Sequence, residues 1–467
     1  MSHSNFGVRS VVALGCMPLA VMLIAGCSGS NTANTVISPP AVTGNAFVIG
    51  TDAPAAGVIS FAVQVQSVNA IDSNGNSVSL VSGTPTVDFA RYNGLQTLLD
   101  LNAVPVGTYN SVQITLGTAT IGYLDTKAGS APTVQSEPAT LSSNTIKVTL
   151  ASPLVVTQSG PVGLRVDFDL YKSIQVDSTG QITGSVTPTF NVSAVASSDA
   201  GGHIDDFEAG VVSVNATGQS FVIQGPHGRQ FTVQVNGQTE FDGNDSLSNL
   251  TTSSIVDVSG TIDKADSTID ADEVAILSQD GFHAAGQVTY VQPPTGTATS
   301  FDLYVRSLLP TTTGLTLGQL ATVNLTGNEK YFIYWMHNPL TQFLFNSAGL
   351  LPGQHVSIGG PASGATNAQA VTAKRVVLRN WGFNGTVVAG SINTTNDTFQ
   401  MNISGFAGLL VTNPVTVYLG TATDFRDGLN SMTNLTGSGN IRVVGLLVKD
   451  PLSGNPVLLA RHIDQLN

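Results

Sequence analysis

Residues 164–170 read LRVDFDL, and the pattern of this stretch indicates the fold class. Apolar side chains at Leu164, Val166 and Phe168 alternate with charged ones at Arg165 and Asp167. Because successive side chains of a β-strand point to opposite faces, the alternation predicts a strand with one buried and one polar face.

Similar runs recur along the chain, and turn residues separate them. Residues 61–66 read FAVQVQ, and residues 72–76 read DSNGN, where Asn74-Gly75 suits the positive φ of a tight turn. The 49 Gly and 21 Pro among 467 residues add further breaks. We therefore expect an all-β protein with several domains, since about 150 residues is typical of one domain.

Charge excludes a nucleic-acid partner. The chain has 17 Lys and Arg against 30 Asp and Glu, which gives a formal net charge of -13. Phosphate backbones are bound by clustered basic side chains, which this composition does not supply. Only 10% of the residues are charged, which also argues against a coiled coil or a charged disordered chain.

The N-terminus has the order of a secretory signal. An apolar run over residues 11–24 follows Arg9, and it is shorter than the about 20 residues that a membrane-spanning helix needs. Ala25 and Gly26 then precede Cys27. These residues resemble the bacterial lipobox, which implies that residues 1–26 are removed and that Cys27 is acylated.

The lipobox resemblance also predicts a location. Ser28 stands where an Asp would retain many lipoproteins at the inner membrane, so the resemblance implies a lipid anchor in the outer membrane, on its periplasmic or cell-surface face. Residues 27–44 are rich in Asn, Thr, Ser and Pro and predict a tether. Cys16 leaves with the signal, so the mature chain would hold no internal disulfide.

The first domain, which we place at residues 45–196, carries an ordered set of short motifs. These are Thr51-Asp52-Ala53-Pro54, Val87-Asp88-Phe89, Leu98-Leu99-Asp100, Pro105-Val106-Gly107-Thr108-Tyr109 and Thr187-Pro188-Thr189-Phe190. In this order they resemble the bacterial domain-of-unknown-function family four-three-eight-two. The resemblance implies an immunoglobulin- or transthyretin-like sandwich on an exported lipoprotein, with no assigned activity.

The rest of the chain repeats itself three times, over residues 205–279, 281–380 and 381–467, here called repeats 1, 2 and 3. Each copy holds five or six short strands, enough for a small closed barrel. We expect repeat 1, from about residue 207 to residue 279, to fold alone as such a barrel. The order of strands resembles domain-of-unknown-function family five-six-six-six, which implies OB-like barrels. Repeat 1 has Thr239-Glu240-Phe241 and repeat 3 has Thr423-Asp424-Phe425, but repeat 2 lacks this Thr-x-Phe element.

Two acidic groups are candidates for chemistry. Asp167 and Asp169 share a strand face roughly 6.6 Å apart, a spacing that suits an inverting glycosidase. A solvated polar face explains them better, because an outer strand face needs polar residues.

A second group could form a calcium site or a hairpin turn, and the turn is favoured because the spacing of a calcium loop is absent. Its members are Asp263, Asp266, Asp270, Asp272 and Glu273.

An aromatic segment stands out in repeat 2, where an insertion of about ten residues falls. Tyr331, Tyr334 and Trp335 form a candidate ligand platform, because exposed rings stack on sugars or bases. The alternative, which we favour, is that these rings pack against a neighbouring barrel.

No motif indicates an enzyme. The nucleophile elbow G-x-S-x-G is absent, the histidines are not at zinc-ligand spacing, and no metal or cofactor is expected. We expect a lipid-anchored envelope protein with a structural or binding role, whose partner beside the membrane is an envelope glycan or protein. Two alternatives stay open: a carbohydrate-active enzyme that uses paired carboxylates, and an envelope assembly subunit.

Overall fold

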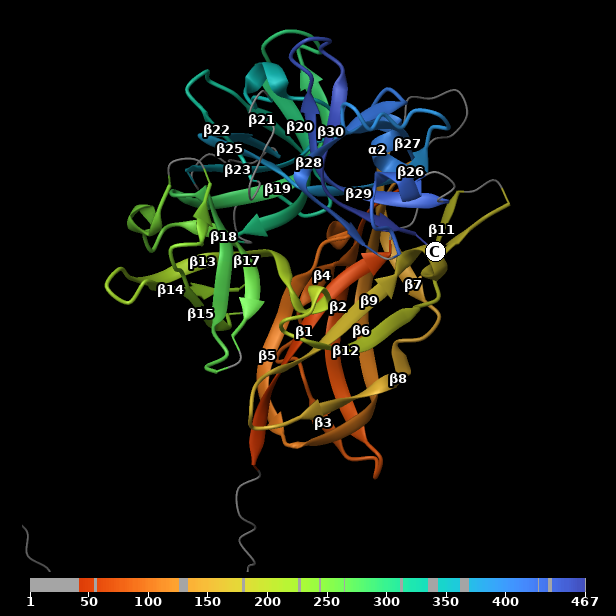
Figure 1. Ribbon diagram of the computed structural model, residues 1–467, viewed down its shortest axis with the longest axis vertical. Helices are drawn as coiled ribbons and strands as arrows, with labels where there is room; N and C mark the ends of the chain where they lie inside the picture. The colour runs from red at the N-terminus through yellow and green to blue at the C-terminus, as the bar shows by residue number, and fades with distance from the viewer. Residues whose placement is uncertain are drawn as a thin grey trace, which may run out of the picture. The chain divides into compact units, whose positions relative to one another are not determined.

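The computed structural model shows an all-β chain, as the alternation predicts (Figure 1). The residues it describes are 42–53, 57–125, 133–178, 181–225, 228–242, 245–263, 265–310, 314–334, 343–361, 369–426, 428–435 and 439–466. The expected signal peptide, Cys27 and most of the expected tether lie outside these ranges. Across them, no helix is long and apolar enough to cross a membrane.

The first domain consists of two sheets. One has the order β12-β9-β1-β5, formed by β12 (Phe190–Ala196), β9 (Val162–Asp169), β1 (Thr43–Ala53) and β5 (Thr97–Pro105). The other has the order β10-β11-β7-β6-β2-β3, formed by β10 (Ile174–Val176), β11 (Ile182–Val186), β7 (Thr133–Leu141), β6 (Gly107–Asp125), β2 (Val58–Asp72) and β3 (Ser77–Ser79). Two further strands, β4 (Thr86–Asp88) and β8 (Thr145–Val156), pair with β2 and β6.

The core of this domain confirms the strand periodicity. Phe61 of β2 and Phe168 of β9 are fully buried in one cluster, with ring centroids 5.1 Å apart in an edge-on arrangement. Val166 lies on the same buried face as Phe168. The predicted turn after β2 is confirmed too: Gly75 has φ +85°, and the carboxylate of Asp72 accepts hydrogen bonds from the backbone of Asn74 and Asn76.

Each repeat forms its own sheet. Repeat 1 contains β13 (Ile204–Asn215), β14 (Ser220–Gln224), β15 (Gln230–Gln234), β16 (Glu240–Phe241), β17 (Ile255–Ile262) and β18 (Ile269–Ser278). Repeat 3 is a closed barrel of β26 (Trp381–Val387), β27 (Thr398–Ile403), β28 (Val415–Arg426), β29 (Asn440–Lys449) and β30 (Pro456–Gln465). In repeat 1, a parallel pair between β15 and β18 closes the ring.

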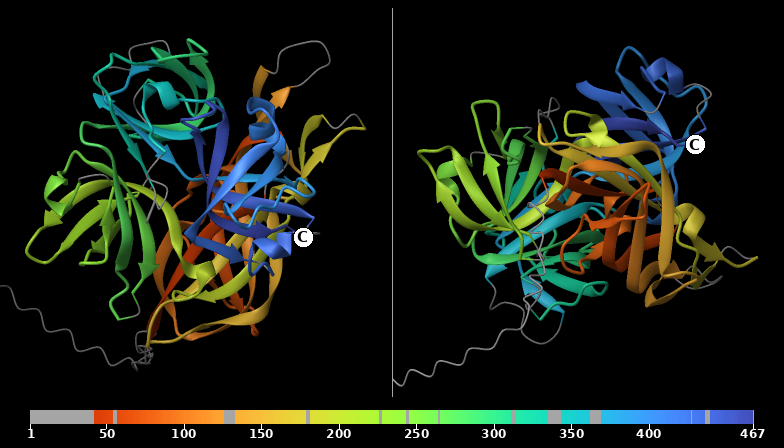
Figure 2. Two further views of the ribbon diagram at one scale, coloured as in Figure 1. Left: turned by 45° about the horizontal axis from the view of Figure 1, so that its top comes forward. Right: turned by 90° about the horizontal axis from the view of Figure 1, so that it is seen from below.

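Repeat 2 forms a seven-stranded sheet, with the order β22-β25-β23-β19-β20-β21-β24. Its strands are β19 (Gly281–Gln292), β20 (Ser300–Leu309), β21 (Leu320–Asn324), β22 (Lys330–Ile333), β23 (His355–Pro361), β24 (Ala370–Thr372) and β25 (Arg375–Arg379). Figure 2 shows the three repeat sheets beside the first domain.

The Thr-x-Phe element has the same role in repeats 1 and 3. The Thr239 hydroxyl donates to the carbonyl of Ala271 at 2.8 Å, and the Thr423 hydroxyl donates to the carbonyl of Ala460 at 2.7 Å. In repeat 2, Glu329 precedes the corresponding strand, and its carboxylate accepts from the Thr326 hydroxyl instead. The missing threonine therefore coincides with a different loop connection.

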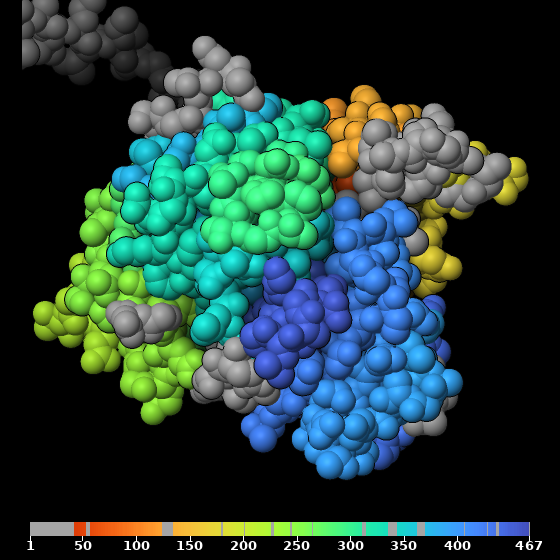
Figure 3. Space-filling model, turned by 90° about the horizontal axis from the view of Figure 1, so that it is seen from above, coloured from red at the N-terminus to blue at the C-terminus, as the bar shows by residue number. Residues whose placement is uncertain are grey.

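The cores run across the boundaries between modules. Phe47, Ile49 and Leu98 of the first domain belong to the core of repeat 1. Leu446 and Leu459 of repeat 3 likewise belong to the core of repeat 2, and Figure 3 shows repeat 2 (green to teal) beside repeat 3 (blue). This sharing argues against the expectation that repeat 1 folds alone, because part of its apolar core comes from the first domain. The core of repeat 3, in contrast, consists of its own residues.

Candidate functional site

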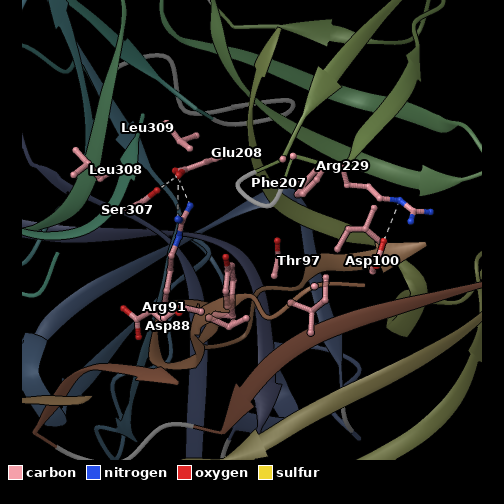
Figure 4. Close-up of a pocket in the computed structure, with 18 of the residues that line it drawn as sticks. Asp88, Arg91, Thr97, Asp100, Phe207, Glu208, Arg229, Ser307, Leu308 and Leu309 are labelled. Carbon is pink, nitrogen blue, oxygen red and sulfur yellow. Dashed lines mark hydrogen bonds and ion pairs between the residues drawn. The ribbon is translucent and has the colours of Figure 1, made fainter. Parts of the chain in front are cut away.

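A cavity of about 670 Å³ lies where the first domain, repeat 1 and repeat 2 meet, and we call it the junction cavity (Figure 4). Its apolar lining includes Val87, Leu98, Leu99, Phe207, Phe231, Leu308, Leu309 and Leu317. Three guanidinium groups and three carboxylates also line it: Arg91, Arg229, Arg306, Asp88, Asp100 and Glu208.

A short 3-10 turn, η1 (Phe89–Tyr92), directs Arg91 toward repeat 1. Phe89 is buried in the core of the first domain, which fixes the turn. Arg91 contacts Glu208 at 2.6 Å and Asp206 at 2.7 Å, and all three side chains are nearly fully buried. The first domain and repeat 1 are thus joined by a buried ion pair, and Figure 4 shows the Arg91 side chain reaching the Glu208 carboxylate.

Glu208 is the centre of this cluster. Besides Arg91, its carboxylate contacts Arg379 of β25 at 2.9 Å, His283 of β19 at 3.2 Å and the Ser307 hydroxyl. Burial acts to raise the pKa of Glu208, but the charges of Arg91 and His283, followed by that of Arg379, outweigh it and hold the pKa well below its usual range. Glu208 is therefore ionised at neutral pH.

For Asp257, the effect of burial on the pKa outweighs the effect of the neighbouring guanidinium. Its carboxylate is fully buried on β17 and contacts Arg379, while it also accepts from the backbone N–H of Phe207 at 2.7 Å. Burial raises the pKa of Asp257 well above its usual range despite the attraction of Arg379. Arg379 thus ties repeat 2 to three carboxylates of repeat 1, those of Asp206, Glu208 and Asp257, which makes the cluster a three-module joint.

The other two guanidinium groups of the junction cavity are paired as well. Arg306 Nε lies 3.0 Å from the Asp88 carboxylate, and its guanidinium lies over the Trp381 ring at 4.5 Å. Arg229 Nε lies 3.3 Å from Asp100. The charges of the lining residues therefore balance. Tyr92 also lines the cavity, and burial raises its pKa to about 12, so that this phenol is neutral.

The aromatic segment of repeat 2 lies elsewhere. Tyr334 is 2% exposed and packs against Ile255 and Leu277 of repeat 1, while Tyr331 is half-buried and meets Phe345 edge-on at 5.6 Å. Burial raises the pKa of Tyr334 well above its usual range. Tyr334 thus contributes packing between repeats 1 and 2. Trp335 lies outside the described residues.

The two carboxylates of β9, Asp167 and Asp169, make different interactions. Asp169 is buried and caps α1 (Leu170–Ser173): it accepts from the Lys172 backbone at 3.0 Å and pairs with the Lys172 ammonium at 2.7 Å. Asp167 is half-buried, accepts from Asn191 at 3.4 Å, and has a pKa raised by burial. Neither residue lines the junction cavity.

The acidic group of repeat 1 forms the predicted hairpin between β17 and β18. Asp263 accepts from the backbone of Ala265 and Asp266, and Asp266 accepts from Thr268. In the part of the chain that the structure describes, no group of three or more His, Cys, Asp or Glu is placed to hold a metal ion.

Sequence reasoning missed the residues of the ion-pair cluster. Arg91, Glu208, Asp257 and Arg379 are far apart in the chain, and each belongs to a segment that otherwise contributes to a core. The available signal was a charged residue within an apolar run, as in Arg375–Arg379, in a chain with 10% charged residues. Such residues are rarely buried unless they are paired.

Comparison with protein-family models agrees with both resemblances. Residues 43–184 match the model described as "Domain of unknown function (DUF4382)", and residues 209–275 match "Domain of unknown function (DUF5666)". No curated protein matches the chain.

Proposed function

We propose that this protein is a non-catalytic protein of the cell envelope, anchored in the outer membrane through acylated Cys27, which binds a ligand or partner at the junction cavity. The observation that carries the proposal is the pairing of every charged group of the cavity lining with an opposite charge. Cavities between domains are common ligand sites, and this one has mostly apolar walls.

The same pairing argues against acid–base catalysis. A general acid or base works best with a pKa near the operating pH and with free access to its proton. Glu208 has a lowered pKa and is buried against Arg91 and Arg379. Asp88 and Asp100 are each held by a guanidinium and by backbone N–H groups.

Two alternatives differ in their support. A carbohydrate-active enzyme built on Asp167 and Asp169 is disfavoured, because Asp169 serves as a helix cap paired with Lys172. An envelope assembly subunit gains support from the joint around Glu208, because a rigid multidomain unit suits a structural role.

The experiment compares two exposed-leucine variants with the parent on an array of envelope glycans and in pull-downs of envelope proteins. Leu317 lines the cavity and Leu452 does not, so Leu317→Arg should lose the bound partner and Leu452→Arg should keep it. Hydrolysis of an envelope glycan by the parent, abolished in Asp167→Asn, would contradict the proposal and favour the enzyme.

A further inference from the structure

We infer that the junction cavity selects a small neutral ligand that has an apolar body and a polar end able to form hydrogen bonds. This inference rests on the proposed function, because it names the chemical class that the same site would take. The argument uses the walls of the cavity, its charges, its rim and the joint that holds it open.

The walls favour an apolar body. Phe207 and Phe231 of repeat 1 lie edge-on to each other, with centroids 5.3 Å apart, and Leu98 and Leu308 face the cavity from the first domain and from repeat 2. Figure 4 shows Leu308 and Leu309 on one side and Phe207 on another. Apolar surface removed from water on both ligand and walls supplies the attraction.

The paired charges of the cavity lining favour a neutral ligand. A charged ligand would leave water for a site in which Arg91, Arg229 and Arg306 each already contact a carboxylate. It would gain little attraction from such pairs, and it would still lose its own hydration. A neutral ligand loses far less hydration, so the balanced lining discriminates by charge.

The rim favours a polar end. Ser82, Thr84 and Thr86 line the cavity and are exposed, whereas Thr97 is buried deeper. Hydroxyl groups both donate and accept, so they suit hydroxyl, ester or amide groups of a ligand. A volume of about 670 Å³ lies within the range usual for sites that enclose a small molecule.

The cavity is formed before a ligand arrives, because its three walls are tied together. Arg91 joins the first domain to repeat 1, and Arg306 joins it to repeat 2 through Asp88. The Ser60 and Tyr304 hydroxyls share a further buried hydrogen bond of 2.8 Å between the first domain and repeat 2. A preformed site binds without the cost of ordering its walls.

Two fluorescent probes with the same aromatic body test the inference. N-phenyl-1-naphthylamine is neutral, and 8-anilinonaphthalene-1-sulfonate adds one sulfonate to the same ring system. The full-length protein should bind the neutral probe at least about tenfold more tightly than the sulfonate. Leu317→Arg should weaken the neutral probe by about tenfold or more, and Leu452→Arg should bind it as the parent does.

The two variants carry the same change at exposed leucines: Leu317 is 47% exposed and Leu452 is 95% exposed. Neither change therefore places an arginine in a core. A thermal melt checks that both remain folded. Equal affinity for the two probes, or unchanged binding in Leu317→Arg, would overturn the inference. Failure of the parent to bind the neutral probe would overturn the inference too. The proposed function would still stand in that case if an envelope partner binds the parent and Leu452→Arg but not Leu317→Arg.

Discussion

The guanidinium of Arg91 and the carboxylate of Glu208 meet at 2.6 Å between the first domain and repeat 1, and each side chain is exposed by no more than 6%. Breaking one partner of such a pair leaves the other charge buried without compensation. We therefore expect the stability of the multidomain unit to depend on this contact.

Arg91→Met should lower the free energy of unfolding by about 3–5 kcal/mol, because Asp206 and Glu208 would lose a buried counter-charge. Arg426→Met is the control, since the Arg426–Asp424 pair is solvent-exposed and worth about 0–1 kcal/mol. Urea denaturation measures both. Equal losses in the two variants would show that the junction pair carries no special stability.

The protein should lose stability as the pH rises toward 9, because His203 loses its proton over this range. Burial acts to lower the pKa of His203, but hydrogen bonds to Asp205 and Asp272 outweigh it and raise the pKa to about 9. The unfolded value is about 6.5, so the stabilisation is complete below pH 6.5 and is lost between pH 6.5 and 9. His203→Gln should flatten the decline in melting temperature over that window, and a slope equal to the parent's would refute the assignment.

Tyr334→Ala should destabilise the protein strongly, because truncating a buried aromatic ring typically costs about 3–5 kcal/mol. Tyr290→Ala is the matched control, because Tyr290 is 48% exposed and a surface change is usually within about 0.5 kcal/mol. Thermal melts compare the two. A small shift for Tyr334→Ala would mean that its ring contributes little to the packing between repeats 1 and 2.

A fragment of residues 204–279 should lack a cooperative melt when it is made alone. It would expose the surface that Phe47 and Leu98 cover, and it would leave Glu208 and Asp257 without Arg91 and Arg379. Residues 42–279, which restore the first domain, should melt at a higher temperature by circular dichroism. A sharp two-state melt of the short fragment would show that the repeat is independent after all.

Cys27→Ser should abolish acylation, because the thiol is the atom that the lipobox resemblance marks for the lipid. Cells supplied with radioactive palmitate should label the parent and leave the variant unlabelled. Variant protein labelled as strongly as the parent would remove the basis for an outer-membrane anchor.

The strands, their turns and the order of the modules can be predicted from the amino-acid sequence, because these features depend on residues close together in the chain. The alternation at Phe61 and at Phe168 reports which face of a strand is buried, and Gly75 permits the positive φ of its turn. Period and turn chemistry are local properties, so they can be read without the fold.

The joint and the junction cavity, in contrast, arise from the packing of the modules against one another. Arg91 and Glu208 are 117 positions apart, and Glu208 and Arg379 are 171 apart, so no local pattern pairs them. The cavity likewise takes its walls from three modules. A charged residue within an apolar strand shows that a partner is needed, but its identity depends on how the modules pack, because ion pairing acts through space over a few ångströms and takes no account of separation along the chain.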